Sequence, residues 1–589
     1  MFRKTAPQRS MFECEFLVPP EKAERLKKSW AEPFRQRILS KINEELFRDA
    51  FSEGTGRPNK SIRLMVGLHL LKEWNDLTDE QVLEQLEYNL QWQYALGLTT
   101  EEAHTCQKSL HNFRVLLMAN ARAQRMFEDL TRSIAEEDGL DLGRQRLDST
   151  HVLSNIAVLT RLGLFVETVT SFLHELRKEV PEAFERVERG YVRRYLEREG
   201  YFSDAKREQA KRRLPVVAQD IYELVRAFEM MPAVEALGSY QNLERLLDEQ
   251  CELVSDDEND GASGGGSSTG GDRLRVKPCD PKTIPSDSLQ SPYDPDATYG
   301  HKGKGYEVQV SETCVDENPY QLITGTSVGG AHESDQGSLL PMLDQLDSAG
   351  MKPSEMDADT GYGSGENIVE CARRGVDLLA PVRDPDAPAP TEHFAAPVCD
   401  ESSVQSSSDA DASVRDEPLA IEEADLVSSE ELAEPELPIA MEAFSFVPTF
   451  EQVLACPAGH GPEEQQLVNG QVIARFSSEH CQGCPFSTRC PTRELVGGDR
   501  QLRRSPAKIA TEQRQAEQQS AEFKDRYRKR SGVESTNNEL KDRHGLGDLR
   551  VRGKPRVELA VHLKALALNV KRSMQYHVAQ MKQYALCPC

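Results

Sequence analysis

Three acidic residues have local settings in which a carboxylate could do chemistry. Asp148 lies inside a β-like stretch, Asp359 follows a predicted strand and precedes a Thr-Gly-Tyr-Gly turn, and Glu534 lies on a predicted helix. Open α/β sheets place their sites at strand ends. Two or three carboxylates that converge there could hold a pair of Mg²⁺ ions about 3.5–4 Å apart and promote attack on a phosphodiester. Taken singly, one of 97 acids at a strand end is usually a solvated surface group.

A group of cysteines is the most specific local motif. It comprises Cys456, Cys481, Cys484 and Cys490. The Cys481-Gln-Gly-Cys484 segment lets two thiolates face one ion, and four thiolates form the closed tetrahedral site that structural Zn²⁺ prefers. The five-residue spacing before Cys490 differs from a regular double CxxC, and His460 or His480 could replace one cysteine. We expect a structural zinc ion, and the alternative is four reduced cysteines in a loop.

The charge of the chain is unevenly distributed. The 589 residues include 71 basic and 97 acidic side chains, a formal net charge of −26. Residues 400–442 contain 14 acids and one base, whereas residues 501–572 contain 18 bases and 9 acids. An acidic tether beside a basic domain is typical of a nucleic-acid-binding protein, although chance clustering on a soluble surface explains the charge alone about equally well.

The hydropathy of the chain argues against a membrane protein. No run of about 18 uncharged apolar residues is present, and the first residues lack the apolar region of a secretory signal. The 13 cysteines are an odd number in a long chain, which favours reduced thiols. We therefore expect a cytoplasmic protein.

The secondary-structure signals divide the chain into helical and α/β sections. Up to about residue 140, short helices alternate with turns, as in helix-turn-helix modules, although any all-helical packing domain has this pattern. Thr78 and Gln81 have the spacing of a capping box. Residues 300–383 alternate between strand-like and helix-like segments, which is typical of an α/β fold.

Three motifs in order resemble those of the DDE transposases of bacterial insertion sequences. They are Leu-Asp148-Ser-Thr, Ala-Asp359-Thr-Gly-Tyr-Gly-Ser and Tyr-Arg-Lys-Arg-Ser-Gly-Val-Glu534-Ser-Thr-Asn-Asn-Glu-Leu-Lys. The group numbered 1182 looks the most similar. The resemblance extends to the N-terminal helical stretch and to the closing helices after Val551, so it covers most of the chain except two linkers. It implies a multi-domain α/β protein with a ribonuclease-H-like mixed sheet flanked by helices.

Composition and secondary-structure signals, taken together with the resemblance, predict the following organisation. The expected segments are a helical N-terminal DNA-binding domain (1–140), the first strand of the catalytic domain (141–155), a helical insert (156–253), a flexible Gly/Ser linker (254–272), the ribonuclease-H-like core (273–398), an acidic disordered linker (399–445), a cysteine-rich insert (446–500) and a basic helical C-terminal part of the catalytic domain (501–589).

The resemblance also implies roles for the acids. In that family two aspartates and a glutamate bind two metal ions, which implies that Asp148, Asp359 and Glu534 are catalytic and hold Mg²⁺ or Mn²⁺. It favours Asp359 over Asp357, although alternation places both on one strand face. Glu539 is the rival of Glu534 but lies at another azimuth of the helix.

Three further residues are candidates for DNA contacts. They are Arg530, Asn538 and Lys541, of which the last two share the helix face of Glu534 at i+4 and i+7. A solvated helix face is the alternative. The implied partners are double-stranded DNA, as terminal inverted repeats and target, and at least one further copy of the chain. The alternative functions are a nuclease of the same fold without strand transfer and a non-catalytic DNA-binding remnant.

Overall fold

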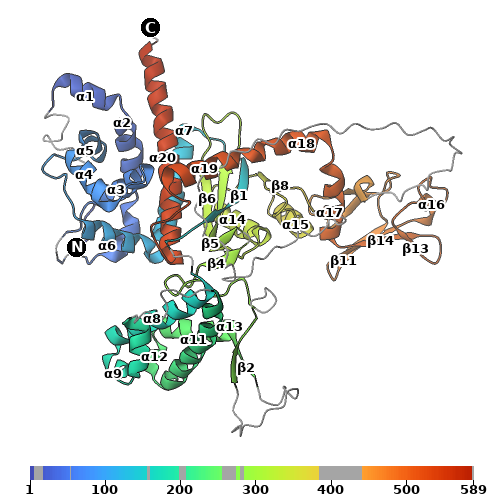
Figure 1. The fold of residues 1–589 in the computed structure, drawn as a ribbon. Helices are drawn as coiled ribbons and strands as arrows, with labels where there is room; N and C mark the ends of the chain where they lie inside the picture. Colours follow the sequence, from blue (N-terminus) through green and yellow to red (C-terminus); the bar gives the residue numbers. More distant parts are fainter. Residues whose placement is uncertain are drawn as a thin grey trace, which may run out of the picture.

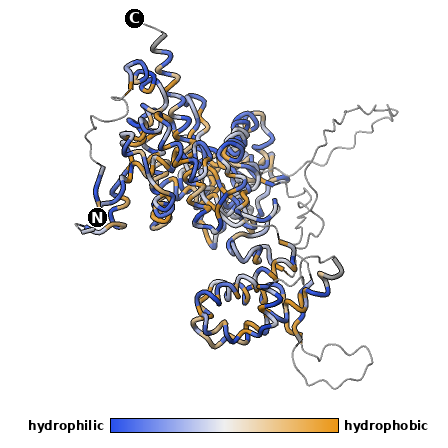
Figure 2. Tube along the Cα trace, turned by 60° about the vertical axis from the view of Figure 1, so that its left-hand side comes forward, coloured by the Kyte–Doolittle hydropathy of each residue, from blue (hydrophilic) through white to orange (hydrophobic). Residues whose placement is uncertain are grey.

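The computed structural model describes residues 1–5, 18–53, 55–56, 58–155, 159–197, 207–254, 273–278, 284–300, 302–383 and 441–586. The predicted linkers at 254–272 and 399–445 therefore lie almost entirely outside the described residues. Figure 1 shows an N-terminal helical body, a central sheet with helices around it, a second helical body and a small β-rich part. In Figure 2 hydrophobic and hydrophilic stretches alternate along each of these parts, and each has its own buried apolar cluster or shares one with its neighbour.

The N-terminal body is built from short helices. They are α1 (Pro20–Lys27), α2 (Ala31–Pro33), α3 (Ile62–Trp74), α4 (Asp79–Tyr88), α5 (Leu90–Leu96), α6 (Gln107–Met118) and α7 (Arg122–Asp138). The predicted capping box at the start of α4 is confirmed, because the Gln81 amide donates to Thr78 Oγ1 at 3.3 Å and the Thr78 amide donates to Gln81 Oε1 at 2.8 Å. These interactions satisfy amides that a helix start otherwise leaves without partners.

The central sheet is mixed. Its strands are β1 (Arg144–Val152), β4 (Thr298–Gly300), β5 (Gly303–Thr313), β6 (Ile323–Gly330), β7 (Glu355–Asp357) and β8 (Asp377–Leu379). Their order is β4-β5-β1-β7-β8, and β6 also pairs with β5, along residues 306–312 and opposite β1. Strand β1 runs antiparallel to β5 and parallel to β7, so it is the centre of the sheet.

Helices cover both faces of this sheet. The helices of this region are α14 (Asp335–Ser348), α15 (Gly365–Arg373), α17 (Pro506–Glu517), α18 (Ala521–Tyr527), α19 (Gly532–His544) and α20 (Lys554–Leu586). On one face Leu147 of β1 belongs to the core formed with α14 and α15. On the other face Val310 of β5 shares a core with Leu540 of α19, with α20 and with the N-terminal body. The prediction of a multi-domain α/β protein with a mixed sheet flanked by helices is confirmed.

The second helical body follows β1 in the chain and has its own core. Its helices are α8 (Arg161–Glu179), α9 (Pro181–Phe184), α10 (Arg189–Tyr191), α11 (Arg207–Phe228), α12 (Pro232–Glu235) and α13 (Gly238–Gln250). The antiparallel pair of β2 (Cys251–Val254) and β3 (Arg273–Val276) leads out of it. Figure 1 shows this body standing apart from the helices that cover the sheet.

The β-rich part precedes α17. Its elements are β9 (Ser445–Phe446), β10 (Val453–Ala455), β11 (Glu464–Val468), β12 (Gln471–Phe476), α16 (Ser478–Cys481), β13 (Arg493–Glu494) and β14 (Arg500–Arg504). Strands β11-β12-β14-β13 form one antiparallel sheet. Its core is small, with Val472, Ala474, Phe476 and Leu502 buried at its centre.

Candidate active site

The register of the sheet places two of the predicted acids side by side. In the parallel pairing of β1 with β7, Arg146 lies opposite Asp357. Asp148 lies two residues further along β1, where alternation keeps it on the same face as Arg146, and Asp359 lies two residues after Asp357, just beyond β7. Asp359 lies in a turn beyond β7, in which its carbonyl accepts from the Tyr362 amide at 3.1 Å.

The start of α19 brings the third acid to this place. Arg146 Nη1 donates to the Lys529 carbonyl at 2.9 Å, which ties the segment before α19 to β1. Gly532 permits the close approach, because a Cβ at this position would lie 2.1 Å from Arg146 Nη1. Glu534, in the first turn of α19, therefore lies above β1 with its side chain 63% exposed.

A single guanidinium links the three carboxylates. Arg530 Nη2 lies 2.6 Å from Asp148 Oδ1 and 3.5 Å from Asp359 Oδ2, and Nη1 lies 3.5 Å from Glu534 Oε1. The Arg530 side chain is 17% exposed, and its Nε has no hydrogen-bond partner among the described residues. Asp148, Asp359 and Glu534 come from three separate segments, and the contacts with Arg530 define one acidic cluster.

The electrostatics of the acidic cluster leave excess negative charge. Burial raises the pKa of Asp148, the Arg530 cation opposes that shift and the negative charge of Asp359 adds to it. Burial lowers the pKa of Arg530, but Asp148 and Asp359 more than offset this, so the pKa is raised and the guanidinium keeps its proton. One cation among three acids does not neutralise them, so the cluster can accept further positive charge.

The polar residues of α19 divide between the cluster and solvent. Asn537, which the sequence did not single out, donates from Nδ2 to Asp148 Oδ2 at 3.1 Å. Asn538 is exposed. Lys541 lies one turn further along and is half-buried; its burial lowers its pKa, as does the charge of Lys302, whereas Asp148 opposes the shift.

The two rival acids have other partners. The Asp357 side chain is fully buried, pairs with Arg144 at 2.9 Å and accepts from Cys314 Sγ. Burial raises the pKa of Asp357 to about 6, against the opposing charge of Arg144. Glu539 pairs with Lys571 at 2.7 Å and Arg572 at 3.4 Å, both on α20.

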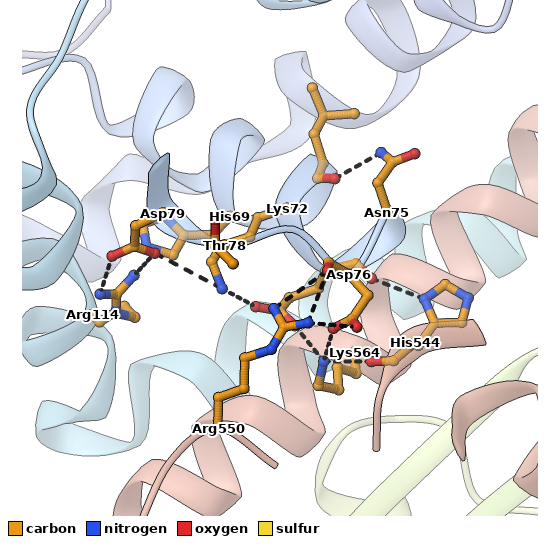
Figure 3. Close-up of polar contacts among 12 residues, drawn as sticks. His69, Lys72, Asn75, Asp76, Thr78, Asp79, Arg114, His544, Arg550 and Lys564 are labelled. Atoms are coloured by element: carbon orange, nitrogen blue, oxygen red, sulfur yellow. Dashed lines mark hydrogen bonds and ion pairs between the residues drawn. The ribbon is translucent and has the colours of Figure 1, made fainter. Parts of the chain in front are cut away.

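A second charged cluster holds the far end of α19. We call Glu73, Asp76, His544, Arg550 and Lys564 the junction cluster. Figure 3 shows Arg550 and Lys564 both reaching Asp76, at 2.9 and 3.3 Å, and Lys564 Nζ also lies 2.7 Å from Glu73 Oε2. The His544 ring donates from Nδ1 to the Glu73 carbonyl at 2.9 Å. The junction cluster therefore fixes the end of α19 and the start of α20 to the N-terminal body.

The four cysteines of the β-rich part surround one small cavity of about 30 Å³. His460 and His480 line it too, with their rings stacked at 4.2 Å. Burial raises the pKa of Cys481, Arg500 opposes this shift, and the other three cysteines of the group add to it. The thiols are free, and the cavity is otherwise lined mainly by apolar atoms.

Neither the acidic cluster nor the group of four cysteines is a preformed metal site. Over the described part of the chain, no group of three or more His, Cys, Asp or Glu side chains is arranged so that it could hold a metal ion as it stands. Within the same residues no helix is long and apolar enough to cross a membrane.

Comparisons with known proteins find two family matches, one in the N-terminal body and one in the C-terminal part of the chain. Residues 21–116 match the family described as Transposase domain (DUF772), and residues 455–574 match the family described as Transposase DDE domain. A 47-residue segment is 49% identical to the "Uncharacterized protein ORF8 in nfe locus" of Rhizobium meliloti, covering 8% of this chain and 23% of that protein. No solved structure matches. The matches support a transposase function generally, and with it DNA as a partner.

Proposed function

We propose that this chain is a DNA transposase of the insertion-sequence group numbered 1182, and that Asp148, Asp359 and Glu534 are its catalytic residues. The observation that carries the proposal is the meeting of these three carboxylates around Arg530, from β1, the turn after β7 and the start of α19. The two transposase family matches also support the proposal, and both lie outside the strands of the central sheet. A ribonuclease-H-like topology of the sheet is part of the proposal.

The proposed cofactor is Mg²⁺ or Mn²⁺, with Asp148, Asp359 and Glu534 as ligands. The donor set fits, because these hard cations prefer carboxylate oxygens and the three carboxylates already share the neighbourhood of one cation, Arg530. Bound there, two such ions would activate the attacking oxygen and stabilise the leaving oxygen. Arg530 must then move from between the carboxylates.

The protein's own groups would orient the DNA strand. Arg530, once it moves off the acids, and the half-buried Lys541 supply positive charge for the phosphate beside the cleaved bond, and the exposed Asn538 is a third DNA contact. Asn537 holds the Asp148 carboxylate in place. Hydrolysis releases a 3′ hydroxyl at the element end; this hydroxyl then attacks a target phosphodiester, whose bridging oxygen leaves with the cut target strand. No serine or tyrosine nucleophile is needed.

The proposed partners follow from this reaction. The substrate is double-stranded DNA, first as terminal inverted repeats and then as target, and the basic stretch at 501–572 supports contact with its phosphates. Two element ends must be brought together, so at least two copies would act on DNA, in the cytoplasm of a bacterial cell. The N-terminal body is the proposed reader of the terminal sequence.

A structural Zn²⁺ ion is proposed for Cys456, Cys481, Cys484 and Cys490. Thiolates are the ligands zinc prefers, the four cysteines surround one cavity, and the small core of the β-rich part gains from such a crosslink. We expect one zinc per chain by elemental analysis of the purified protein. Cys484→Ser loses it and Cys106→Ser, an exposed cysteine elsewhere, retains it. Absence of zinc from the unsubstituted protein contradicts the proposal.

The function is tested with a labelled duplex that carries the flanking genomic ends, incubated with Mg²⁺ or EDTA. We expect Mg²⁺-dependent nicking followed by a joined product, lost in Asp359→Ala and retained in Asp344→Asn, a change at an exposed acid of α14. Nicking without joining identifies the nuclease alternative. Binding without nicking identifies the DNA-binding remnant and overturns the proposal.

A further inference from the structure

A second polar network reaches the acidic cluster from the opposite face of the sheet. It centres on Asp335, the first residue of α14. Asp335 Oδ2 accepts from Ser149 Oγ at 3.1 Å, and Oδ1 accepts from Gln309 Nε2 at 2.9 Å. Ser149 and Gln309 are direct neighbours in the pairing of β1 with β5. Asp335 thus joins two strands at the level of Asp148.

The same network holds the turn that carries Asp359. The hydroxyl of Tyr362, which is fully buried, donates to Gln309 Oε1, and the Tyr362 amide donates to the Asp359 carbonyl. Gly361 lies between the two carboxylates: a Cβ built there would lie 2.9 Å from Asp359 Oδ1 and 3.4 Å from Asp335 Oδ2. Side chains larger than glycine would therefore push the carboxylates apart.

The hydrogen bonds of this network lie on the opposite side of β1 from the Asp148 carboxylate. Because successive side chains of a strand point to opposite faces, Ser149 lies on the side away from Asp148. A hydrogen bond to Ser149 therefore fixes the backbone of Asp148 without touching its carboxylate. Burial raises the pKa of Asp335, the hydrogen bonds from Gln309 and Ser149 oppose this shift, and the negative charges of Glu307 and Asp359 add to it.

We propose that Asp335 is a positioning residue that sets the spacing of Asp148 and Asp359, and through it the affinity of the acidic cluster for divalent cations. This inference rests on the proposed function. Asp335 connects Ser149 to the Gln309–Tyr362 pair, so it ties the strand of one metal-binding aspartate to the turn of the other. Residues that hydrogen-bond around metal ligands typically change metal affinity about 10–100-fold when removed.

The test is a Mn²⁺ titration of the purified full-length chain by calorimetry, in which the binding that Asp359→Ala abolishes is assigned to the acidic cluster. We expect Asp335→Ala to weaken this binding about 10-fold or more. Asp335→Asn keeps one acceptor oxygen and weakens it less. The matched control is Asp344→Asn, an exposed acid further along α14 that pairs with Arg374, and it leaves the binding unchanged.

Ser149→Ala provides a second route if Asp335→Ala does not fold, because it removes one donor and no charge. A smaller loss of Mn²⁺ affinity than in Asp335→Ala is expected, with unchanged binding of duplex DNA. Lower thermal stability with unchanged Mn²⁺ affinity in these variants overturns the inference alone. Absence of any Mn²⁺ binding that depends on Asp359 overturns the proposed function as well.

Discussion

The two ends of α19 carry charged clusters that use the same side-chain chemistry in opposite ways. At the start of the helix, three carboxylates share one guanidinium, and Glu534 is 63% exposed. About 20 Å away at its end, Glu73 and Asp76 contact Lys564 and Arg550, and the Lys564 side chain is only 6% exposed. The junction cluster is charge-balanced around a buried lysine, whereas the acidic cluster has more acids than cations and includes a largely exposed glutamate.

This difference indicates that the junction cluster stabilises the fold, whereas the acidic cluster is suited to binding a cation. Buried charges persist only when partners compensate for the lost hydration, and in the junction cluster every acid has a cation within 3.3 Å. Burial raises the pKa of Glu73, but Lys564 and Lys72 more than offset it and lower the pKa to about 2. At Asp148 burial prevails and the pKa is raised. An acid that is hard to ionise among other acids indicates a place suited to an additional cation.

The largest expected effect is on activity, from Glu534→Gln. The change removes one proposed metal ligand, and a bound metal ion contributes several kcal/mol to stabilising the transition state, so we expect a loss of cleavage of about 10²–10³-fold. Because Glu534 is largely exposed, the thermal transition should stay in place. The cleavage assay and a thermal melt measure the two effects. If the variant cleaves DNA normally but unfolds at a lower temperature, Glu534 stabilises the fold, as the junction cluster does, and is not catalytic.

The next effect is on stability, from Glu73→Gln. It leaves the buried ammonium of Lys564 with only the partly exposed Asp76 as an acidic partner, and removing one partner of a buried pair costs about 3–5 kcal/mol. Hydrogen exchange of peptides from α3 and α20, together with chemical denaturation, measures the loss. Glu84→Gln on the exposed side of α4 is the matched control. Unchanged protection of both helices would show that the junction cluster contributes nothing to the packing of the two parts.

Much of this arrangement was predictable from local sequence, and the contacts that decide it were not. The β-like stretch around Asp148, the turn after Asp359 and the helix of Glu534 are local patterns, and the structure has each of them. Asn537 and Asn538 lie three and four residues after Glu534, so both are its neighbours on the helix. Which of them hydrogen-bonds to Asp148 depends on how α19 is rotated about its axis when it packs on the sheet.

Longer-range contacts were less accessible still. Asp335 meets Ser149 across 186 residues, and Lys564 meets Asp76 across 488. The periodicity of helices and strands relates only residues that are close in sequence, so it does not connect such pairs. The sequence therefore indicated which acids lie on which elements, and only the packed sheet and helices determine the partner of each acid.

The junction cluster should also respond to acid in a defined direction. The pKa of Glu73 is about 2 in the folded chain and 4.5 ordinarily, so the ionised group stabilises the fold fully above pH 4.5. This contribution is lost as the pH falls toward 2, at about 1.4 kcal/mol per pH unit. The difference in stability between the unsubstituted protein and Glu73→Gln should therefore narrow below pH 4.5. Denaturation curves from pH 7 to pH 3 measure it, and a constant difference would refute the assigned ion pairs.

The smallest expected effect comes from within the junction cluster itself. Arg550 and Lys564 both contact Asp76, but the Arg550 side chain is 54% exposed. Solvent screens such a pair, so Arg550→Ala should cost about 0–1 kcal/mol, whereas Lys564→Ala leaves Glu73 buried with Lys72 as its remaining cation and should cost several times more. Denaturation of both single variants and of the double variant gives the coupling energy. If Arg550→Ala lowers the free energy of unfolding as much as Lys564→Ala does, burial does not determine how strongly each cation stabilises the fold. The two ends of α19 then differ only in the number of cations that accompany their acids.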